Sequence, residues 1–242
     1  VENVPPQKPC ADGPQAPQTE CKLKRHTMFS AKTYAARRNM LRTKIGSGII
    51  LLPGNSLSPN NYPNNAYYFR QDSSFRYYFG LNTPSLAGLI DADTGEEALY
   101  GDDFTVEDII WTGPQPTLRE LGAEVGVTAT FPMAELEKRL RKAVSLGRKI
   151  HYLPPYRGET KLQLSALLGI KPELLHDYKS VELMFAVAEM REKKSAEEVE
   201  AMERAFLIGY QMHTLAMKMC RPGVVELSLI HISEPTRQAE IS

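Results

Sequence analysis

The sequence predicts an α/β protein, in which helices cover a sheet. Two observations carry this prediction. Between about residue 28 and residue 188, short apolar runs alternate with stretches that repeat apolar residues every three or four positions. Gly and Pro punctuate this alternation, as they do at the ends of strands and helices. We therefore expect one α/β domain over residues 28–188, a length of about 160 residues that can bury a substantial core.

The expected strands are short apolar runs. "GIILLPG" at residues 48–54 is closed by Pro-Gly and predicts a buried strand. Residues 85–101 hold two apolar runs on either side of Asp93-Thr94-Gly95, which predicts a hairpin. "KIHYLPP" at residues 149–155 predicts a further strand that the prolines stop.

The expected helices follow from apolar residues at three- and four-residue steps. They cover residues 28–46, 117–126, 133–147 and 161–170. The second and third of these stretches end at Gly, which favours the left-handed conformation at a helix C-terminus. Residues 181–191 are apolar and fit either a helix or a strand.

The strongest helix signal lies near the end of the chain. Ser195 is a natural N-cap, and Glu198 completes a capping box three positions later. From Ala205 onward most faces of this helix are apolar, which is typical of a helix buried inside a larger core. His213 lies on the apolar stripe and is expected to be a hydrogen-bonded core residue. We interpret the four glutamates of the first turns as a solvated cluster favoured by the helix dipole: Glu197, Glu198, Glu200 and Glu203.

Composition excludes several classes of function. The formal net charge is zero, so no basic field argues for a nucleic-acid or membrane partner. No stretch approaches the roughly 20 apolar residues of a membrane span. The three cysteines have no zinc-site spacing, and no metal ligand can be named in this chain. A reducing, cytoplasmic setting is expected.

Both ends of the chain look foreign to this fold. Residues 1–27 carry five prolines and little apolar periodicity, which predicts a disordered or non-native extension, with Met28 as the expected true start. Residues 227–242 break the preceding helical pattern and resemble the translation of a sequencing-library adapter. We expect both tails to pack against nothing.

Two aromatic stretches are candidates for a site. "NAYYFRQDSSFRYYFGL" at residues 65–81 predicts a short helix capped by Asp72 or Ser73, with three aromatic side chains on one face. It reads either as an aromatic core, in which Arg70 pairs with Asp72, or as a substrate-facing rim; spacing favours the core. The second stretch, residues 107–118, places the chain's single Trp, Trp111, beside Gly113 in an expected loop, as a core plug or an interface anchor.

These segments resemble the aminopeptidase P (Xaa-Pro aminopeptidase) family. "YYFRQDSSFRYYFGL" and "IIWTGPQPTL" resemble segments of that family's N-terminal domain. "MREKKSAEEVEAMERA" resembles the junction at which aminopeptidase P, prolidase and creatinase pass into their catalytic domain, and "MKMCRPGVVE" resembles the end of the first helix of that domain. The matching positions at the junction are Arg191, Lys194, Ser195 and Glu198. The resemblance implies a ribonuclease H-like mixed sheet with flanking helices over residues 28–188. Residues 189–226 would then be a linker and the first helix of a truncated "pita-bread" metallopeptidase domain.

The resemblance also implies a function. Family members use two metal ions, usually manganese, to activate a water that attacks the bond before proline, so the expected partner is a peptide with proline at its second position. The five ligands would all lie beyond Glu226, so this chain is expected to hold no catalytic residue, to bind no manganese and to be inactive. A homo-oligomer is expected, in which Trp111 reaches toward a neighbouring active site, with Arg70 as a second substrate-binding candidate. The alternatives are a prolidase or creatinase-like hydrolase, and a non-enzymatic binding protein of the same fold.

Overall fold

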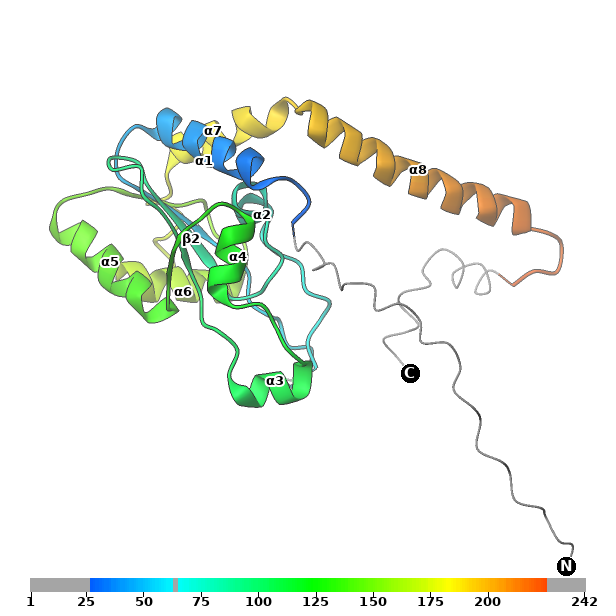
Figure 1. Cartoon of the computed structure of the whole chain (residues 1–242), viewed down its shortest axis with the longest axis horizontal. Coiled ribbons are helices and arrows are strands. Elements are labelled where there is room, and N and C mark those ends of the chain that lie inside the picture. Colours follow the sequence, from blue (N-terminus) through cyan, green and yellow to red (C-terminus); the bar gives the residue numbers. More distant parts are fainter. Residues whose placement is uncertain (1–26, 63–64, 226–242) are drawn as a thin grey trace, which may run out of the picture.

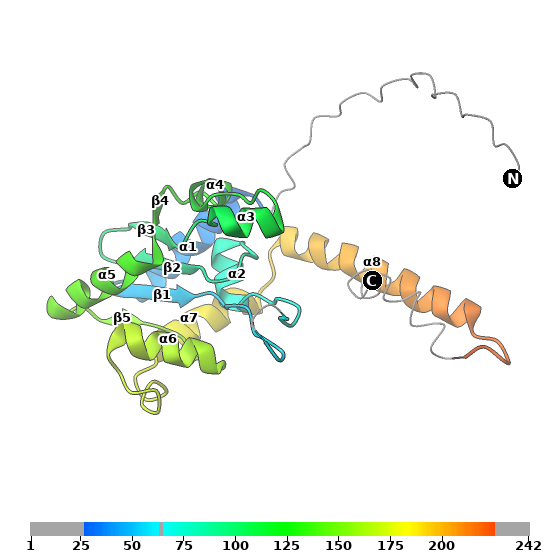
Figure 2. The ribbon, with the colours of Figure 1, turned by 90° about the horizontal axis from the view of Figure 1, so that it is seen from below.

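The computed structural model describes residues 27–62 and 65–225. The expectations for the two tails fall on residues 1–26 and 226–242, almost entirely outside the described part, so they stay predictions. Within the described ranges the chain forms a three-layer α/β/α domain, and a single long helix leaves it (Figures 1 and 2).

The central sheet is mixed and has the strand order β4-β3-β2-β1-β5. Its strands are β1 (Ile49–Pro53), β2 (Ala87–Asp91), β3 (Glu97–Tyr100), β4 (Ala129–Phe131) and β5 (Ile150–His151). The first three form an antiparallel meander, in which Leu51 lies opposite Leu89. β5 pairs parallel to β1, and β4 pairs parallel to β3. The expected strand, hairpin and third strand are therefore confirmed; β4 is an addition, three half-buried residues that carry too weak a pattern to predict.

Helices cover both faces of this sheet (Figure 2). One face carries α1 (Ala31–Ile45), α2 (Ser73–Phe79), α4 (Leu118–Glu124) and α7 (Val181–Glu192), and the other carries α5 (Met133–Ser145) and α6 (Gly158–Leu168). Each of the four helices that the periodicity predicts is present. The ambiguous residues 181–191 form a helix, α7, which Ser180 caps and whose buried apolar side chains share one core with α1 and the sheet.

The alternation of side chains along the strands builds two separate cores. Ile50 and Leu52 of β1 point toward α1, α2 and α7, whereas Ile49 and Leu51 point toward α5 and α6. All four side chains are at most 1% exposed. A buried strand with both faces covered reads as a continuous apolar run, which is the reason "IILL" contains no polar position.

Residues 107–112 correct the sequence analysis. They were expected in a loop, but they belong to helix α3 (Val106–Thr112). Thr105 and Asp108 form a capping box, with each side chain bonded to the other residue's backbone N–H. This local signal outweighs the Gly and Pro that follow the helix.

The last helix, α8 (Ala196–Met219), begins at the predicted capping box of Ser195 and Glu198 and extends away from the domain (Figure 1). It contains no buried residue. His213 is exposed, so the expectation of a core histidine is wrong for this structure, because nothing among the described residues covers that face. The predicted boundary at residue 188 lies inside α7, and the helical path breaks only at Lys193, whose backbone is extended.

Candidate functional site

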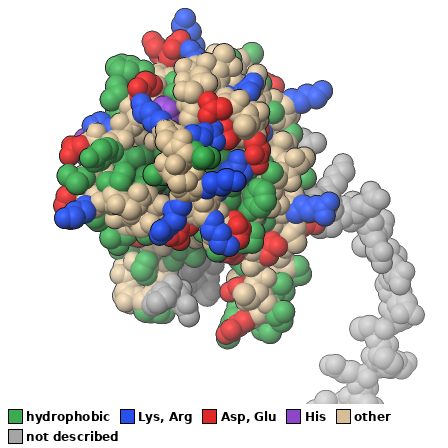
Figure 3. Space-filling model, turned by 90° about the vertical axis from the view of Figure 1, so that its left-hand side faces the viewer, with side chains coloured by type: hydrophobic (Ala, Val, Ile, Leu, Met, Phe, Trp, Pro, Cys, Tyr) green, Lys and Arg blue, Asp and Glu red, His purple; other side chains and the backbone are tan. Residues whose placement is uncertain are grey.

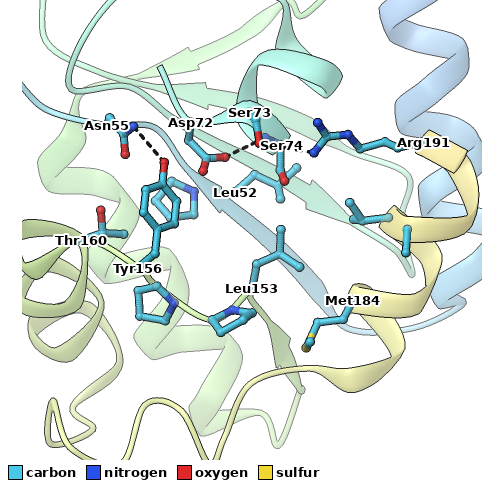
Figure 4. A pocket seen from close by; sticks show the side chains of 15 residues that line it. Leu52, Asn55, Asp72, Ser73, Ser74, Leu153, Tyr156, Thr160, Met184 and Arg191 are labelled. Carbon is cyan, nitrogen blue, oxygen red and sulfur yellow. Dashed lines mark hydrogen bonds between the residues drawn. The ribbon is translucent and has the colours of Figure 1, made fainter. Parts of the chain in front are cut away.

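A pocket of about 480 Å³ opens at one edge of the sheet, between the ends of β1 and β5 and the side of α7 (Figure 4). Because β1 and β5 run parallel, their carboxyl ends meet at this edge. The residues that follow each strand, Pro53 to Asn55 and Leu153 to Tyr156, therefore form facing walls. In open α/β sheets ligands bind at such an edge.

The floor and sides of the pocket are mostly apolar. Leu52 and Leu153 come from the sheet region, and Met184 and Val187 come from α7. Two charged side chains stand at the margin, Asp72 at the start of α2 and Arg191 in the last turn of α7. This arrangement suits a ligand with an apolar body and a polar end.

Asp72 is held by its own helix. One carboxylate oxygen accepts hydrogen bonds from the backbone N–H groups of Ser74 (2.9 Å) and Phe75 (2.8 Å), which makes Asp72, one of the two predicted candidates, the N-cap of α2. Gly80 ends α2 in the left-handed conformation, at a φ of 70°. The three aromatic side chains expected on one face, Phe75, Tyr78 and Phe79, are fully buried, which confirms the core interpretation.

A buried polar cluster stiffens the opposite wall. The Asn55 backbone N–H donates to Gln71 Oε1 at 2.6 Å, and the Asn55 side-chain amide donates to the Arg70 carbonyl at 2.9 Å and to the Tyr156 hydroxyl at 3.2 Å. Gln71 in turn donates to the Thr83 carbonyl at 2.7 Å. Asn55 and Gln71 are 4% and 8% exposed, so each bond satisfies a group that burial would otherwise penalise.

Arg70 lies at this wall, but its side chain is exposed and does not pair with Asp72. The expected Arg70–Asp72 pair is therefore wrong. The Asp72 carboxylate is committed to the helix cap, and the Arg70 backbone, rather than its side chain, is fixed by Asn55.

Trp111 lies apart from the pocket, in the last turn of α3. Its side chain is 83% exposed, as expected for an interface anchor and not for a core plug. Val106 and Ile110 on the same helix are 77% and 75% exposed, and no residue of α3 is buried. The structure thus separates the two candidate residues: Arg70 lies near the pocket wall, and Trp111 is on a projecting helix (Figure 1).

Neither a metal site nor a membrane span is found in the part of the chain that the structure describes. No group of three or more His, Cys, Asp or Glu side chains there is placed to hold a metal ion, so these residues do not fit the manganese pair that the family resemblance implies. Within residues 27–62 and 65–225, every helix is too short or too polar to cross a membrane. The face in Figure 3 mixes acidic, basic and apolar side chains.

Sequence reasoning missed most of the pocket. Its walls come from segments more than 100 residues apart, around Asn55 and Tyr156, and neither segment carries a periodic pattern. The one available signal was the pair of prolines, Pro154 and Pro155, which marks where the chain leaves the sheet at its carboxyl edge.

The fold defines a class: an α/β domain with a mixed five-stranded sheet, followed by one long helix that contributes no buried residue. Residues 34–152 match the family model described as aminopeptidase P, N-terminal domain. Over 211 residues the chain is 28% identical to the Xaa-Pro aminopeptidase of Escherichia coli (strain K12), an alignment that covers 83% of this chain and 47% of that protein.

Solved structures agree on the fold. The structure of Pseudomonas aeruginosa aminopeptidase PepP superposes with a TM-score of 0.72 at 22% identity, covering 87% of this chain and 49% of that one. Zn-substituted E. coli aminopeptidase P in complex with product gives a TM-score of 0.72 at 22% identity, covering 88% and 50%. The chain spans about half the length of the relatives it matches. Sequence and fold thus agree that residues 34–152 are similar to the N-terminal domain of aminopeptidase P.

Proposed function

We propose that this chain is the N-terminal part of an Xaa-Pro aminopeptidase, a cytoplasmic enzyme that removes an N-terminal residue preceding proline. The main support for this proposal is the family match over residues 34–152 together with the 28% identity over 211 residues to a curated Xaa-Pro aminopeptidase. In this proposal the domain builds the homo-oligomer and helps to cover the substrate. The exposed α3 with Trp111 supports an oligomer contact, because a projecting apolar helix needs a partner surface.

The chemistry is proposed for the second half of the enzyme, beyond Glu226. Two manganese ions held there would lower the pKa of a bound water and orient it toward the carbonyl before proline. One of the similar structures is a Zn-substituted enzyme, which supports metal dependence in the relatives. The described residues of this chain offer no comparable ligand group, so we propose that the chain alone is inactive.

The test is to recover the source gene, determine its reading frame past codon 226 and express the full-length protein. After removal of metal by a chelator and reloading with manganese, an Xaa-Pro peptide should be cut and a matched Xaa-Ala peptide should not. Cleavage of Xaa-Pro dipeptides alone would favour prolidase, and hydrolysis of creatine would favour creatinase. A folded protein without hydrolytic activity would favour the non-enzymatic binding class and contradict the proposal.

The chain itself provides a second test. Calorimetric titration with manganese should show no tight stoichiometric site, and the same Xaa-Pro peptide should stay intact in the presence of the metal. Metal-dependent cleavage by the purified chain would show that a catalytic centre lies within these 242 residues.

A further inference from the structure

One buried arginine connects the domain to the start of α8. Arg37, on α1, is 8% exposed. Its guanidinium carbon lies 4.2 Å from the ring centroid of Tyr77 and 4.7 Å from that of Phe29, and its Nη1 donates to the Tyr77 carbonyl at 3.0 Å. The charge is thus enclosed by aromatic rings, which attract a cation but do not neutralise it.

Glu198 supplies the opposite charge from α8. Its Oε1 lies 3.2 Å from Arg37 Nη2, and the two side chains are 15% and 9% exposed. Nη2 is buried and forms no hydrogen bond within the described ranges, and the Glu198 carboxylate is the charged group that faces it there. Glu198 is therefore the group that compensates the buried charge, and a pair this enclosed is screened little by salt.

The same carboxylate also starts the helix. Glu198 Oε2 accepts the Ser195 backbone N–H at 2.8 Å, and the Ser195 hydroxyl accepts the Glu198 N–H at 3.3 Å. One oxygen of Glu198 therefore caps α8 while the other faces Arg37. The position of the first turn of α8 is set by α1 through a side chain that cannot move without giving up one of its two roles.

Little else fixes the direction of α8. The Thr33 hydroxyl donates to Glu197 Oε2 at 2.9 Å, but this bond is exposed to water. No residue of α8 is buried, and beyond its first turns the helix leads away from the domain (Figure 1). Lys193, the residue that follows α7, has an extended backbone and interrupts the helical path between α7 and α8.

We propose that the Arg37–Glu198 pair is a latch that fixes the direction in which α8 leaves the domain, and with it the placement of whatever follows α8. Tyr77 supports the latch from both sides. The carbonyl and the ring of Tyr77 both contact Arg37. On the other side, its hydroxyl donates to the Met190 carbonyl at 3.1 Å, and the guanidinium carbon of Arg191 lies 5.7 Å from its ring centroid. Tyr77 of α2 thus contacts the end of α7 directly and is linked to the start of α8 through Arg37. Both residues of the latch lie within this chain, so the proposal does not depend on which reaction the full-length protein catalyses.

The test measures the distance distribution between the domain and α8 by double electron–electron resonance. The native cysteines Cys10, Cys21 and Cys220 are replaced by serine, and spin labels are attached after Lys142→Cys on α5 and Glu203→Cys on α8. Both label positions are exposed. Labelled protein is diluted with unlabelled protein, so that contacts between copies do not contribute.

The decisive variant is Glu198→Gln. Glutamine can still form the capping box, but it removes the charge that faces Arg37. We expect the distance distribution to become at least about twofold broader, because α8 gains alternative directions about the break at Lys193. Glu200→Gln is the matched control, because it removes the same charge two positions later from a residue whose one charged partner in the described part of the chain is Arg204 of its own helix. Its distribution should keep the parent width.

Arg37→Lys provides a second route, should Glu198→Gln lower the helical content in circular dichroism. A single ammonium cannot donate to the Tyr77 carbonyl and reach Glu198 with the geometry of the guanidinium fork, so the same broadening is expected. An unchanged width in the folded Glu198→Gln and Arg37→Lys proteins would overturn the latch. Equal broadening by Glu200→Gln would do so as well, since it would assign the effect to the charge of α8 as a whole.

Discussion

At the scale of single residues, Arg38 is a buried side chain whose three guanidinium nitrogens all donate hydrogen bonds. It is completely buried, and burial lowers the pKa of its guanidinium, an effect that the neighbouring Glu97 opposes. Its Nε donates to Glu97 at 2.7 Å, and its two terminal nitrogens donate to the carbonyls of Tyr78 and Val125, both at 3.0 Å. One side chain of α1 thereby ties α2, β3 and the end of α4 together.

Arg38→Met should lower the free energy of unfolding by about 3–5 kcal/mol, because it leaves the Glu97 carboxylate and two carbonyls without their donor. Urea denaturation followed by circular dichroism measures the change. Arg42→Met is the matched control, one turn along the same helix, where the side chain bonds only to Asn39 and is partly exposed. It should cost about 1 kcal/mol or less. Equal losses of unfolding free energy in the two variants would mean that the hydrogen bonds of Arg38 stabilise the domain no more than the side chain of Arg42 does.

Asp91, at the end of β2, is the clearest source of acid sensitivity. Burial acts to raise the pKa of this carboxyl, but hydrogen bonds from Arg148 and from the backbone of Thr94 and Asp93 outweigh burial and lower the pKa from 3.8 to about 2. Because the folded pKa lies below the unfolded one, the carboxylate stabilises the fold fully above about pH 4. That contribution, about 2 kcal/mol, is lost as the pH falls from about 4 to about 2.

Arg148→Gln should raise the pKa of Asp91, because burial then dominates over the remaining backbone hydrogen bonds. Carboxyl carbon chemical shifts, recorded by NMR from about pH 1 to about pH 6, give the pKa directly, because that range includes both the lowered and the ordinary pKa of an Asp carboxyl. Arg141→Gln, which removes a partner of the exposed Glu137, should leave the Asp91 midpoint unchanged. A low midpoint that survives Arg148→Gln would assign the lowered pKa to the turn backbone together with Arg139, whose Nη2 lies 3.9 Å from Asp91 Oδ2.

At the scale of elements, α3 is a short capped helix that contributes no residue to either core. It has a complete capping box and no buried residue, so its apolar side chains do not stabilise this domain. Trp111→Ala should therefore change the free energy of unfolding by no more than about 0.5 kcal/mol. As the only Trp of the chain, Trp111 should also fluoresce like a solvent-exposed indole.

The full-length protein should behave differently at α3. There we expect Trp111→Ala to weaken subunit association and the binding of longer peptides, and we expect the emission of Trp111 to shift to shorter wavelength when subunits assemble. Sedimentation velocity and KM for peptides of increasing length are the measurements. Tyr178→Ala removes another exposed aromatic, outside α3, and should change neither. Unchanged assembly and KM in Trp111→Ala would remove the proposed role of α3.

The pocket walls illustrate why local patterns found the elements but not the site. Each strand and helix depends on side chains a few positions apart, so periodicity and caps reveal it. The contact between Asn55 and Tyr156 instead depends on β5 pairing parallel to β1, which no local pattern contains. The same reason explains the error at Arg70: its proximity to Asp72 in the chain suggested a pair, but the helix cap claims the carboxylate.

At the scale of the whole molecule, α8 is a long helix with no buried residue. Its apolar side chains are exposed around the circumference, including Phe206 at 68%, Tyr210 at 68% and Met217 at 73%. A large apolar side chain contributes roughly 1.5–3 kcal/mol when it is buried, and domain stability is typically only about 5–15 kcal/mol. Burial against another surface would therefore stabilise α8 by an amount comparable to the stability of the domain.

We expect the isolated chain to associate with increasing concentration, or α8 to fray at its end. Sedimentation velocity over a concentration series and hydrogen exchange of the α8 amides measure these two outcomes. A variant that stops after Lys194 lacks α8 and should associate less than the parent chain at every concentration, with the domain still folded, because the two cores contain no residue of α8. A monomeric parent chain whose α8 amides are protected as strongly as those of α1 would contradict this expectation.

The sequence by itself determined the parts whose causes are local. The capping box at Ser195, the cap at Asp72, the continuous apolar run of β1 and the hairpin around Asp93 each follow from residues within a few positions. The tertiary structure alone decided which segments meet: the parallel pairing of β5 with β1, the pocket at their carboxyl ends, the exposure of Trp111 on a helix, and the approach of Arg37 to Glu198. The physical reason is that a helix or turn forms through bonds along the chain. A contact between residues 161 positions apart forms only after the core that α1 and α7 share has brought these two helices together.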